Sequence, residues 1–230
     1  TRSVNEKSYV KAIFAYNHSQ VDAYHELVYR QLNADSMYQV DSMRPLLDYT
    51  FRDDRIVGHV FYNSKLNSRN VVKFGVVAEQ IFFDYVDSTW IFDSTQTDYL
   101  DWRVRWNTAI QAQLLQPYIQ WKHRTERGLT VTAGIHSQWF TLSNSISWAE
   151  PRIAMKKTLR DGSSITGGIG MHSQVQPYYM YFYSLSENAD GTRALHNKTM
   201  DFSYAGHAVM GYERMLKPML RFKSEVYYQY

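Results

Sequence analysis

The tripeptide His-Ser-Gln occurs twice in the chain, at residues 136–138 and 172–174. Imidazole and amide side chains can bind polar ligands by hydrogen bonds, and each repeat spaces its His and Gln two residues apart. On a β-strand this spacing places both side chains on one face. We expect His136, Gln138, His172 and Gln174 to face a polar lumen, where they either touch a ligand or an internal domain or simply line the wall.

Catalytic and cofactor chemistry has little support in the sequence. No carboxylate lies at an obvious ligand spacing from His136 and His172, so we expect no metal site. The sequence holds no nucleophile elbow, no zinc-protease helix motif and no phosphate loop. The glycines at 167–170 lie within a strand pattern and do not open a helix, which argues against a dinucleotide fingerprint. We therefore expect no enzyme and no cofactor.

Two aromatic groups could bind ligands from outside. Trp90, Trp102 and Trp106 lie in a polar stretch with the carboxylates of Asp87, Asp93, Asp98 and Asp101. On an outward loop this combination could bind sugars or cationic groups, or it could pack the loop on itself.

The second group is the aromatic run at 178–183, which includes Tyr178, Tyr179 and Tyr181. We expect it to cap an outer rim, as part of an aromatic girdle or as a ligand platform.

The composition favours strands. The chain has 19 Tyr, 11 Phe and 6 Trp in 230 residues, and strands and membrane interfaces are enriched in aromatic residues. Cys is absent, so no disulfide framework is possible. The net charge of +3 is small and dispersed, so we expect no nucleic-acid partner. No apolar run approaches the ~18 residues of a transmembrane helix, but alternating barrel strands need none.

Short and long connections are predicted to alternate along the chain. Short turns are expected at 67–68, 125–128, 160–162 and 217–218, and long connections at 30–49, 84–107, 141–147 and 176–200. Up-and-down membrane barrels have short periplasmic turns and long outer loops. The pattern predicts about nine strands, near 8–28, 51–66, 70–83, 108–123, 129–140, 148–158, 163–175, 201–214 and 219–230.

Period-two patterning supports these strands. Between 115 and 122, Leu115, Ile119 and Trp121 share one face, while Gln120 and Lys122 lie on the other. An apolar face toward lipid and a polar face toward a lumen produce this pattern, although a half-buried soluble sheet produces it too. We expect Gln120 and Lys122 to face the ligand or an internal domain.

Several ordered segments resemble the TonB-dependent receptors of the Bacteroidetes type. The segments are Leu114–Trp121, Gly128–His136, Phe140–Leu142, Glu150–Arg152, Gly170–Gln174 with Gln176–Pro177, Met200–Phe202, Val209–Tyr212 and Ser224–Tyr230. The tripeptide Glu150-Pro151-Arg152 looks like the element that opens a strand in that group. The resemblance covers roughly residues 110–230, and residues 1–109 match only in style.

The resemblance implies an all-β, antiparallel up-and-down transmembrane barrel of about 22 strands, closed by an N-terminal plug. Residues 1–230 would form part of this single domain without the plug, so we expect the chain to belong to a longer protein. The implied function is TonB-dependent import of a siderophore, glycan, peptide or corrinoid across the outer membrane of a Gram-negative bacterium. The implied partners are outer-membrane lipid and the TonB complex.

Two other interpretations remain open. A receptor-like barrel could serve as a structural subunit of a larger surface assembly, with a surface lipoprotein as partner. A soluble all-β binding domain would show the same alternation, but it would dissolve without detergent.

Overall fold

The computed structural model describes residues 1–92, 99–184 and 194–230, and the side chains of 91–101 are not described. The strands are β1 (Arg2–Asn5), β2 (Ser8–Leu32), β3 (Tyr38–Lys65), β4 (Asn70–Phe92), β5 (Tyr99–Arg124), β6 (Leu129–Phe140), β7 (Ser145–Thr158), β8 (Ser164–Gln174), β9 (Ser203–Lys217) and β10 (Leu220–Gln229). A short 3₁₀ helix, η1 (Tyr178–Phe182), follows β8. No described helix is long and apolar enough to cross a membrane.

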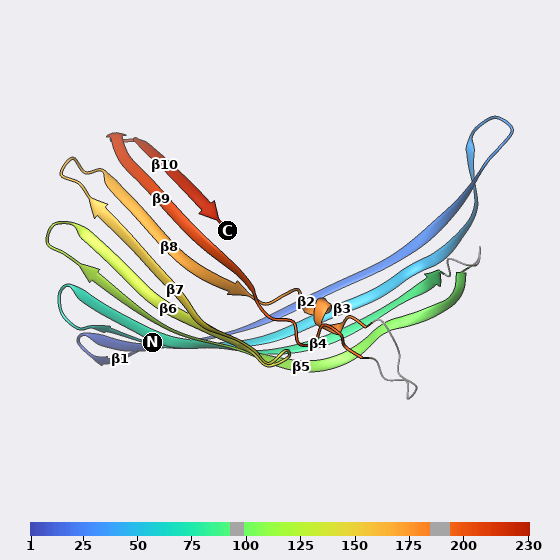
Figure 1. Cartoon of the computed structure of the whole chain (residues 1–230), viewed down its shortest axis with the longest axis horizontal. Coiled ribbons are helices and arrows are strands. Elements are labelled where there is room, and N and C mark those ends of the chain that lie inside the picture. The colour runs from blue at the N-terminus through green and yellow to red at the C-terminus, as the bar shows by residue number, and fades with distance from the viewer. Residues whose placement is uncertain (93–98, 185–193) are drawn as a thin grey trace.

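The strands form one antiparallel sheet in which each strand pairs with its sequence neighbours, in the order β1 to β10. This confirms the predicted all-β, up-and-down fold. The described residues contain ten strands where the sequence predicted about nine, because the short β1 at the start was missed. Figure 1 shows β2 to β5 as long strands that extend well past β6 to β10, and the sheet is curved and twisted.

The predicted short turns are present at one end of the sheet. Asn67 Oδ1 accepts hydrogen bonds from the backbone N–H groups of Arg69 and Asn70, which closes the β3–β4 turn. Gly128 and Gly162 have positive φ angles of 74° and 80°, a region that glycine enters without strain. These side-chain and backbone features explain why the turns at this end of the sheet could be predicted from the sequence.

The opposite end departs from the prediction. The expected loop at 30–49 is only a turn at 33–37, because β2 continues to Leu32 and β3 begins at Tyr38. The expected loop at 84–107 is largely strand as well, since β4 runs to Phe92 and β5 starts at Tyr99. Only the connection between β8 and β9 is long among those that the structure describes in part or in full. The strict alternation of short and long connections is therefore wrong.

These strands were missed because their polarity was mistaken for a loop signal. Their charged side chains are paired across strands, as in the ion pairs of Arg52 with Asp84 and of Arg105 with Asp87. Such pairing stabilises the polar side of these strands. Polar pairing of this kind leaves no hydrophobic periodicity in a single sequence.

The register divides the side chains into two faces. Val10, Tyr62, Phe74 and Ile119 follow one another across β2 to β5. In the adjacent row Val72 pairs with Trp121, and Trp121 then pairs with Ala133. The row continues through Ile153, Ile169, Ala208 and Tyr228. Parallel rows contain Phe14 and Val76, and further on Met155 and Met210. We call this surface the apolar face; its rows end at Tyr16, Ile56, Ala78 and Leu115.

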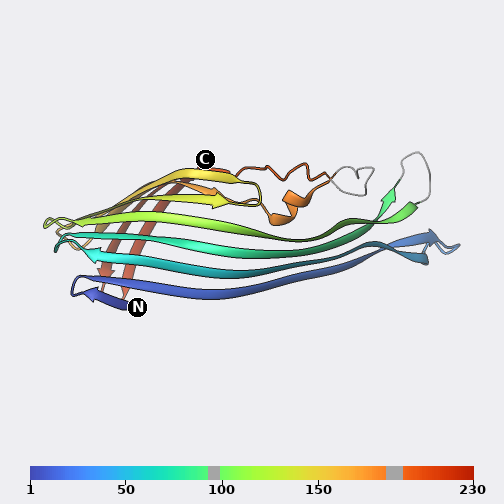
Figure 2. The same ribbon diagram turned by 90° about the horizontal axis from the view of Figure 1, so that it is seen from below.

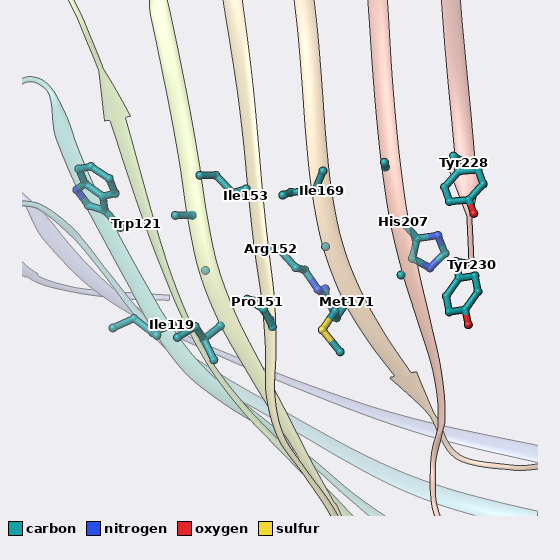
Figure 3. Close-up of a pocket in the computed structure, with 16 residues that line it drawn as sticks. Ile119, Trp121, Pro151, Arg152, Ile153, Ile169, Met171, His207, Tyr228 and Tyr230 are labelled. Atoms are coloured by element: carbon teal, nitrogen blue, oxygen red, sulfur yellow. The ribbon is translucent and has the colours of Figure 1, made fainter.

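The side chains of the apolar face are exposed. Phe14, Ile169 and Met210 retain 73%, 63% and 64% of their accessible surface. Figure 3 shows Trp121, Ile153, Ile169 and Tyr228, which lie on β5, β7, β8 and β10, around an apolar hollow of about 740 Å³. Monomeric soluble proteins rarely expose a continuous apolar surface of this extent.

Beyond Tyr16 the same face becomes polar. Asp54 accepts hydrogen bonds from the Tyr16 hydroxyl at 2.6 Å and lies 2.7 Å from His18 Nδ1, and Arg52 is paired with Asp84. From this level β2 continues to Leu32, which at about 3.3 Å per residue is roughly 50 Å of strand. The sheet therefore has an apolar belt beside the short turns and a long polar extension beyond it.

Candidate functional site

The face opposite the apolar belt, which we call the polar face, is organised around Glu150 on β7. Glu150 is fully buried. Its Oε1 accepts hydrogen bonds from Gln138 Nε2 at 2.9 Å, from Ser147 Oγ at 3.1 Å and from the Ser173 hydroxyl. Its Oε2 lies 3.1 Å from both His136 Nδ1 and an Arg152 guanidinium nitrogen. A buried carboxylate with this many donors is well compensated for its loss of hydration.

A β-bulge brings these groups together. The β6–β7 register shifts between His136 and Gln138, so His136 pairs with Glu150 while Gln138 pairs with Ser147. The bulge aims both side chains at the same carboxylate. Ser173 reaches it from β8, and Gln116 of β5 donates to Gln138 Oε1 at 2.8 Å. The two His-Ser-Gln repeats thus meet through Glu150, which lies on the strand between them.

The structure separates the predicted lumen residues into two groups. Gln138 is buried, and its amide donates hydrogen bonds to Glu150 and Ser173, so it stabilises the sheet. His172, Gln174, Gln120 and Lys122 are exposed, and His136 is partly exposed. His172 packs edge-on against His207 of β9, with 4.7 Å between the ring centroids.

Sequence reasoning missed several members of this face. Glu150 and Arg152 were noted only for a family resemblance, and Lys73, His59 and His207 were not among the predicted lumen residues. His59 lies 3.0 Å from the Tyr118 hydroxyl, and the Lys73 ammonium lies 4.2 Å from the Phe61 ring centroid. The cross-strand register places these residues beside one another. The sequence of a single strand does not show which residues of the neighbouring strands lie next to it. Among the described residues, no group of three or more His, Cys, Asp or Glu side chains is arranged to hold a metal ion.

The tryptophans predicted for an outer loop lie on paired strands. Trp90 of β4 pairs with Trp102 of β5, and their rings meet edge-on at 5.8 Å. Trp106 lies on the polar face, 5.4 Å from the ring of Phe51. The prediction that these residues occupy a loop is wrong, because the segment continues the hairpin. Asp93 and Asp98 lie outside the described residues, as does the side chain of Asp101.

The tyrosine run folds back onto the polar face. Tyr181 and Phe182 of η1 are buried, and Phe182 packs against Phe83 and Tyr85. Figure 2 shows η1 resting on one side of the long strands. Tyr178 packs against Phe83 and Phe140, and Tyr179 stacks near Phe51. This position corrects the girdle interpretation, because a girdle would lie on the apolar face.

Two charged side chains, those of Asp53 and Arg55, contact tyrosines of this aromatic cluster. The Tyr85 hydroxyl donates a 2.6 Å hydrogen bond to Asp53, and the Arg55 guanidinium lies 5.0 Å from the Tyr178 ring centroid. Burial raises the pKa of Tyr85 well above its ordinary value, and the hydrogen bond to Asp53 raises it further. Tyr85 therefore stays protonated as a donor, and the cluster acts as a packed support between η1 and the sheet.

The structure defines the class of fold. An up-and-down antiparallel sheet with an exposed apolar belt on one face and polar side chains on the other is typical of the wall of a transmembrane β-barrel. No protein-family model matches the chain, and no curated protein matches it.

A solved structure supports this assignment. The chain is similar to the crystal structure of the outer membrane transporter YddB from Escherichia coli, with a TM-score of 0.64 and 11% sequence identity. The match covers 98% of this chain and 32% of that chain. The chain thus spans about a third of the length of its structural relative, and at this identity the likeness concerns the fold.

Proposed function

We propose that the chain forms part of the wall of a barrel that imports a scarce nutrient across the outer membrane of a Gram-negative bacterium. The observation that carries this proposal is the contrast between the two faces. The apolar belt gives acyl chains a continuous surface, with Phe14 and Ile169 largely exposed. The opposite face presents hydrated groups such as Gln120, Lys122 and His172, as a lumen requires.

The energy source is the finer part of the proposal. The ordered resemblance from Leu114 to Tyr230 supports coupling to the TonB complex through a plug domain. The fold of a known outer membrane transporter supports transport in general. The buried network of Glu150 gives the lumen wall a rigid surface, against which a plug could move.

Deletion of the gene in its native bacterium tests transport. We expect growth on one limiting nutrient to fail in the deletion strain and to return with the intact gene. Disruption of the TonB system should produce the same defect, while a strain lacking both should be no worse than either. Normal uptake of iron chelates, glycans, peptides and corrinoids by the deletion strain would contradict the proposal.

The second candidate function is a structural subunit of a surface assembly, with a surface lipoprotein as partner. The β2–β3 hairpin favours it, because Leu32, Met37 and Tyr38 at its tip are exposed, Tyr38 to 71%. Exposed apolar side chains this far from the belt are suited to a protein contact. A stoichiometric partner in pull-downs, lost on Tyr38→Ser while uptake is normal, would favour this alternative.

A further inference from the structure

One row of the polar face joins two cations and an imidazole across six strands. Lys73 on β4 pairs with Gln120, Gln120 pairs with Gly134, and Gly134 pairs with Arg152. Arg152 then pairs with Gly170, and Gly170 with His207. Along this line, which runs across the strands, Gly134 and Gly170 flank Arg152, and Gln120 lies between Lys73 and Gly134.

The glycines form the floor of a hollow of about 580 Å³. A Cβ on Gly134 would lie 2.8 Å from the Ile119 carbonyl oxygen, so no larger residue fits there without a shift of the backbone. A Cβ on Gly170 would lie 3.1 Å from Arg152 Cγ. Glycines inside strands often mark places where a ligand or another backbone approaches closely.

The charged side chains around this floor have one sign. Lys73 and Arg152 are cations, and the other ionisable side chains that line the hollow are Tyr118 and four imidazoles, those of His59, His136, His172 and His207. The buried Glu150 accepts a hydrogen bond from one guanidinium nitrogen of Arg152, whose side chain stays 44% exposed. Among the described residues, no carboxylate lies within 4.0 Å of the Lys73 ammonium.

The surrounding face has the same bias. The register places Lys11, Lys65, Lys122, Arg124 and Lys156 on the polar face of β2 to β8, between the short turns and the level of Glu79. In the described part of β2 to β8, the carboxylates on this part of the polar face are those of Glu79 and Glu150. A basic concavity with low-dielectric walls concentrates anions.

We propose that the hollow binds an anionic group of the transported solute, a carboxylate or a phosphate. The inference rests on the proposed import function and names the chemical class of its substrate. Lys73 supplies an ammonium held above the Phe61 and Tyr118 rings, and Arg152 supplies the guanidinium nitrogens that Glu150 does not engage. The imidazoles of His172 and His207 close the far side.

Calorimetric titration of the intact protein, purified from membranes in detergent at low ionic strength, tests this site. Citrate and pyrophosphate are the probes, one for each source of negative charge, and spermidine is the probe of opposite charge. We expect at least one of the two anions to bind and spermidine not to bind. Lys73→Gln should weaken anion binding about tenfold, the loss expected for one charged hydrogen bond.

Two further variants make the test specific. Gly168 also lines the hollow, and a Cβ there meets its neighbours at 3.5 Å or more, so Gly168→Leu should fold and fill the space. It should weaken anion binding as Lys73→Gln does. Lys7→Gln removes an exposed lysine from the β1–β2 turn and should bind as the wild type does.

The proposal is overturned if neither anion binds, or if Lys73→Gln and Gly168→Leu bind as tightly as the wild type. These results are independent of the uptake assay. Uptake that depends on the gene, together with no anion binding, would refute the anionic site and leave transport standing. Anion binding at Lys73 in a protein whose loss leaves uptake normal would refute transport while supporting the site.

Discussion

Arg152 donates a hydrogen bond to Glu150 at 3.1 Å, although the two residues lie only two positions apart on β7. Alternation places both on the polar face, and the bulge beside Gln138 lets the carboxylate sink while the guanidinium stays at the surface. Glu150, which is buried, links strands β6 to β8, and Arg152, which is exposed, lies at the surface of the polar face.

Because Glu150 is the shared acceptor of several hydrogen bonds, its truncation should cause a large loss of stability. Glu150→Ala removes the acceptor that Gln138, Ser147 and Ser173 share and leaves the His136 and Arg152 side chains without this carboxylate, which should cost about 3–5 kcal/mol. Urea unfolding of the refolded protein in detergent measures the change. Glu126→Ala removes an exposed carboxylate from a short turn and should cost less than ~1 kcal/mol. Equal losses of unfolding free energy in the two variants would contradict the role of Glu150 as the shared acceptor.

The packing of η1 predicts a local effect. Phe182 is fully buried against Phe83 and Tyr85, and removal of such a side chain costs about 3–5 kcal/mol. Phe182→Ala should release the segment from the sheet and speed proteolytic cleavage near residue 180, with a smaller change in global unfolding. Tyr183→Ala, at a more exposed position, is the control. Cleavage at the wild-type rate would show that Phe182 does not hold η1.

The assignment of the two faces predicts opposite responses to a new charge. Ile169→Arg places a guanidinium in the lipid belt, where the expected loss is about 2–4 kcal/mol. Thr132→Arg places the same group on the polar face beside Lys122 and should cost less than ~1 kcal/mol. Unfolding in lipid vesicles provides both values. A larger loss for Thr132→Arg would reverse the assignment of the faces.

The β7–β8 turn predicts a pH dependence. The Ser163 hydroxyl donates to Asp161 at 2.6 Å and its backbone N–H donates at 3.1 Å, which lowers the pKa of Asp161 below its ordinary value of 3.8. A lowered folded-state pKa stabilises the fold above the unfolded value, and this stabilisation is lost as the pH falls through the folded value.

Asp161→Asn should therefore lower the thermal unfolding midpoint at pH 7, and the difference from wild type should shrink well below pH 3.8. Ser163→Ala removes the hydroxyl donor and should reduce the pH-dependent part of that difference. A difference that is the same at both pH values would contradict the assigned cause.

The sequence predicted the features that local chemistry controls. Turns at Asn67, Gly128 and Gly162 were located because their residues suit tight turns, and Ile119 and Trp121 alternate with Gln120 and Lys122 in a period that only a strand shows. The polar extensions of β2 to β5 were missed, since pairs such as Arg52 with Asp84 form only across strands.

The site was only partly predictable for the same reason. His136 and His172 were found by their repeated motif, but the repeat did not indicate that Gln138 would be buried under Glu150. The row from Lys73 to His207 depends on the register of six strands, and a one-residue slip would move its members to the other face.

A spin-label scan along β8 tests the central claim, that one face contacts lipid and the other a lumen. Cys is absent from these 230 residues, so single cysteines from Ile165 to Gln174 can each carry one nitroxide in vesicles once any cysteine elsewhere in the intact protein is replaced. We predict that labels at 165, 167, 169 and 171 are relaxed mainly by oxygen, and labels at 166, 168, 170 and 172 mainly by a water-soluble nickel complex. Uniform access of the nickel complex to every position, or no alternation at all, would contradict the account.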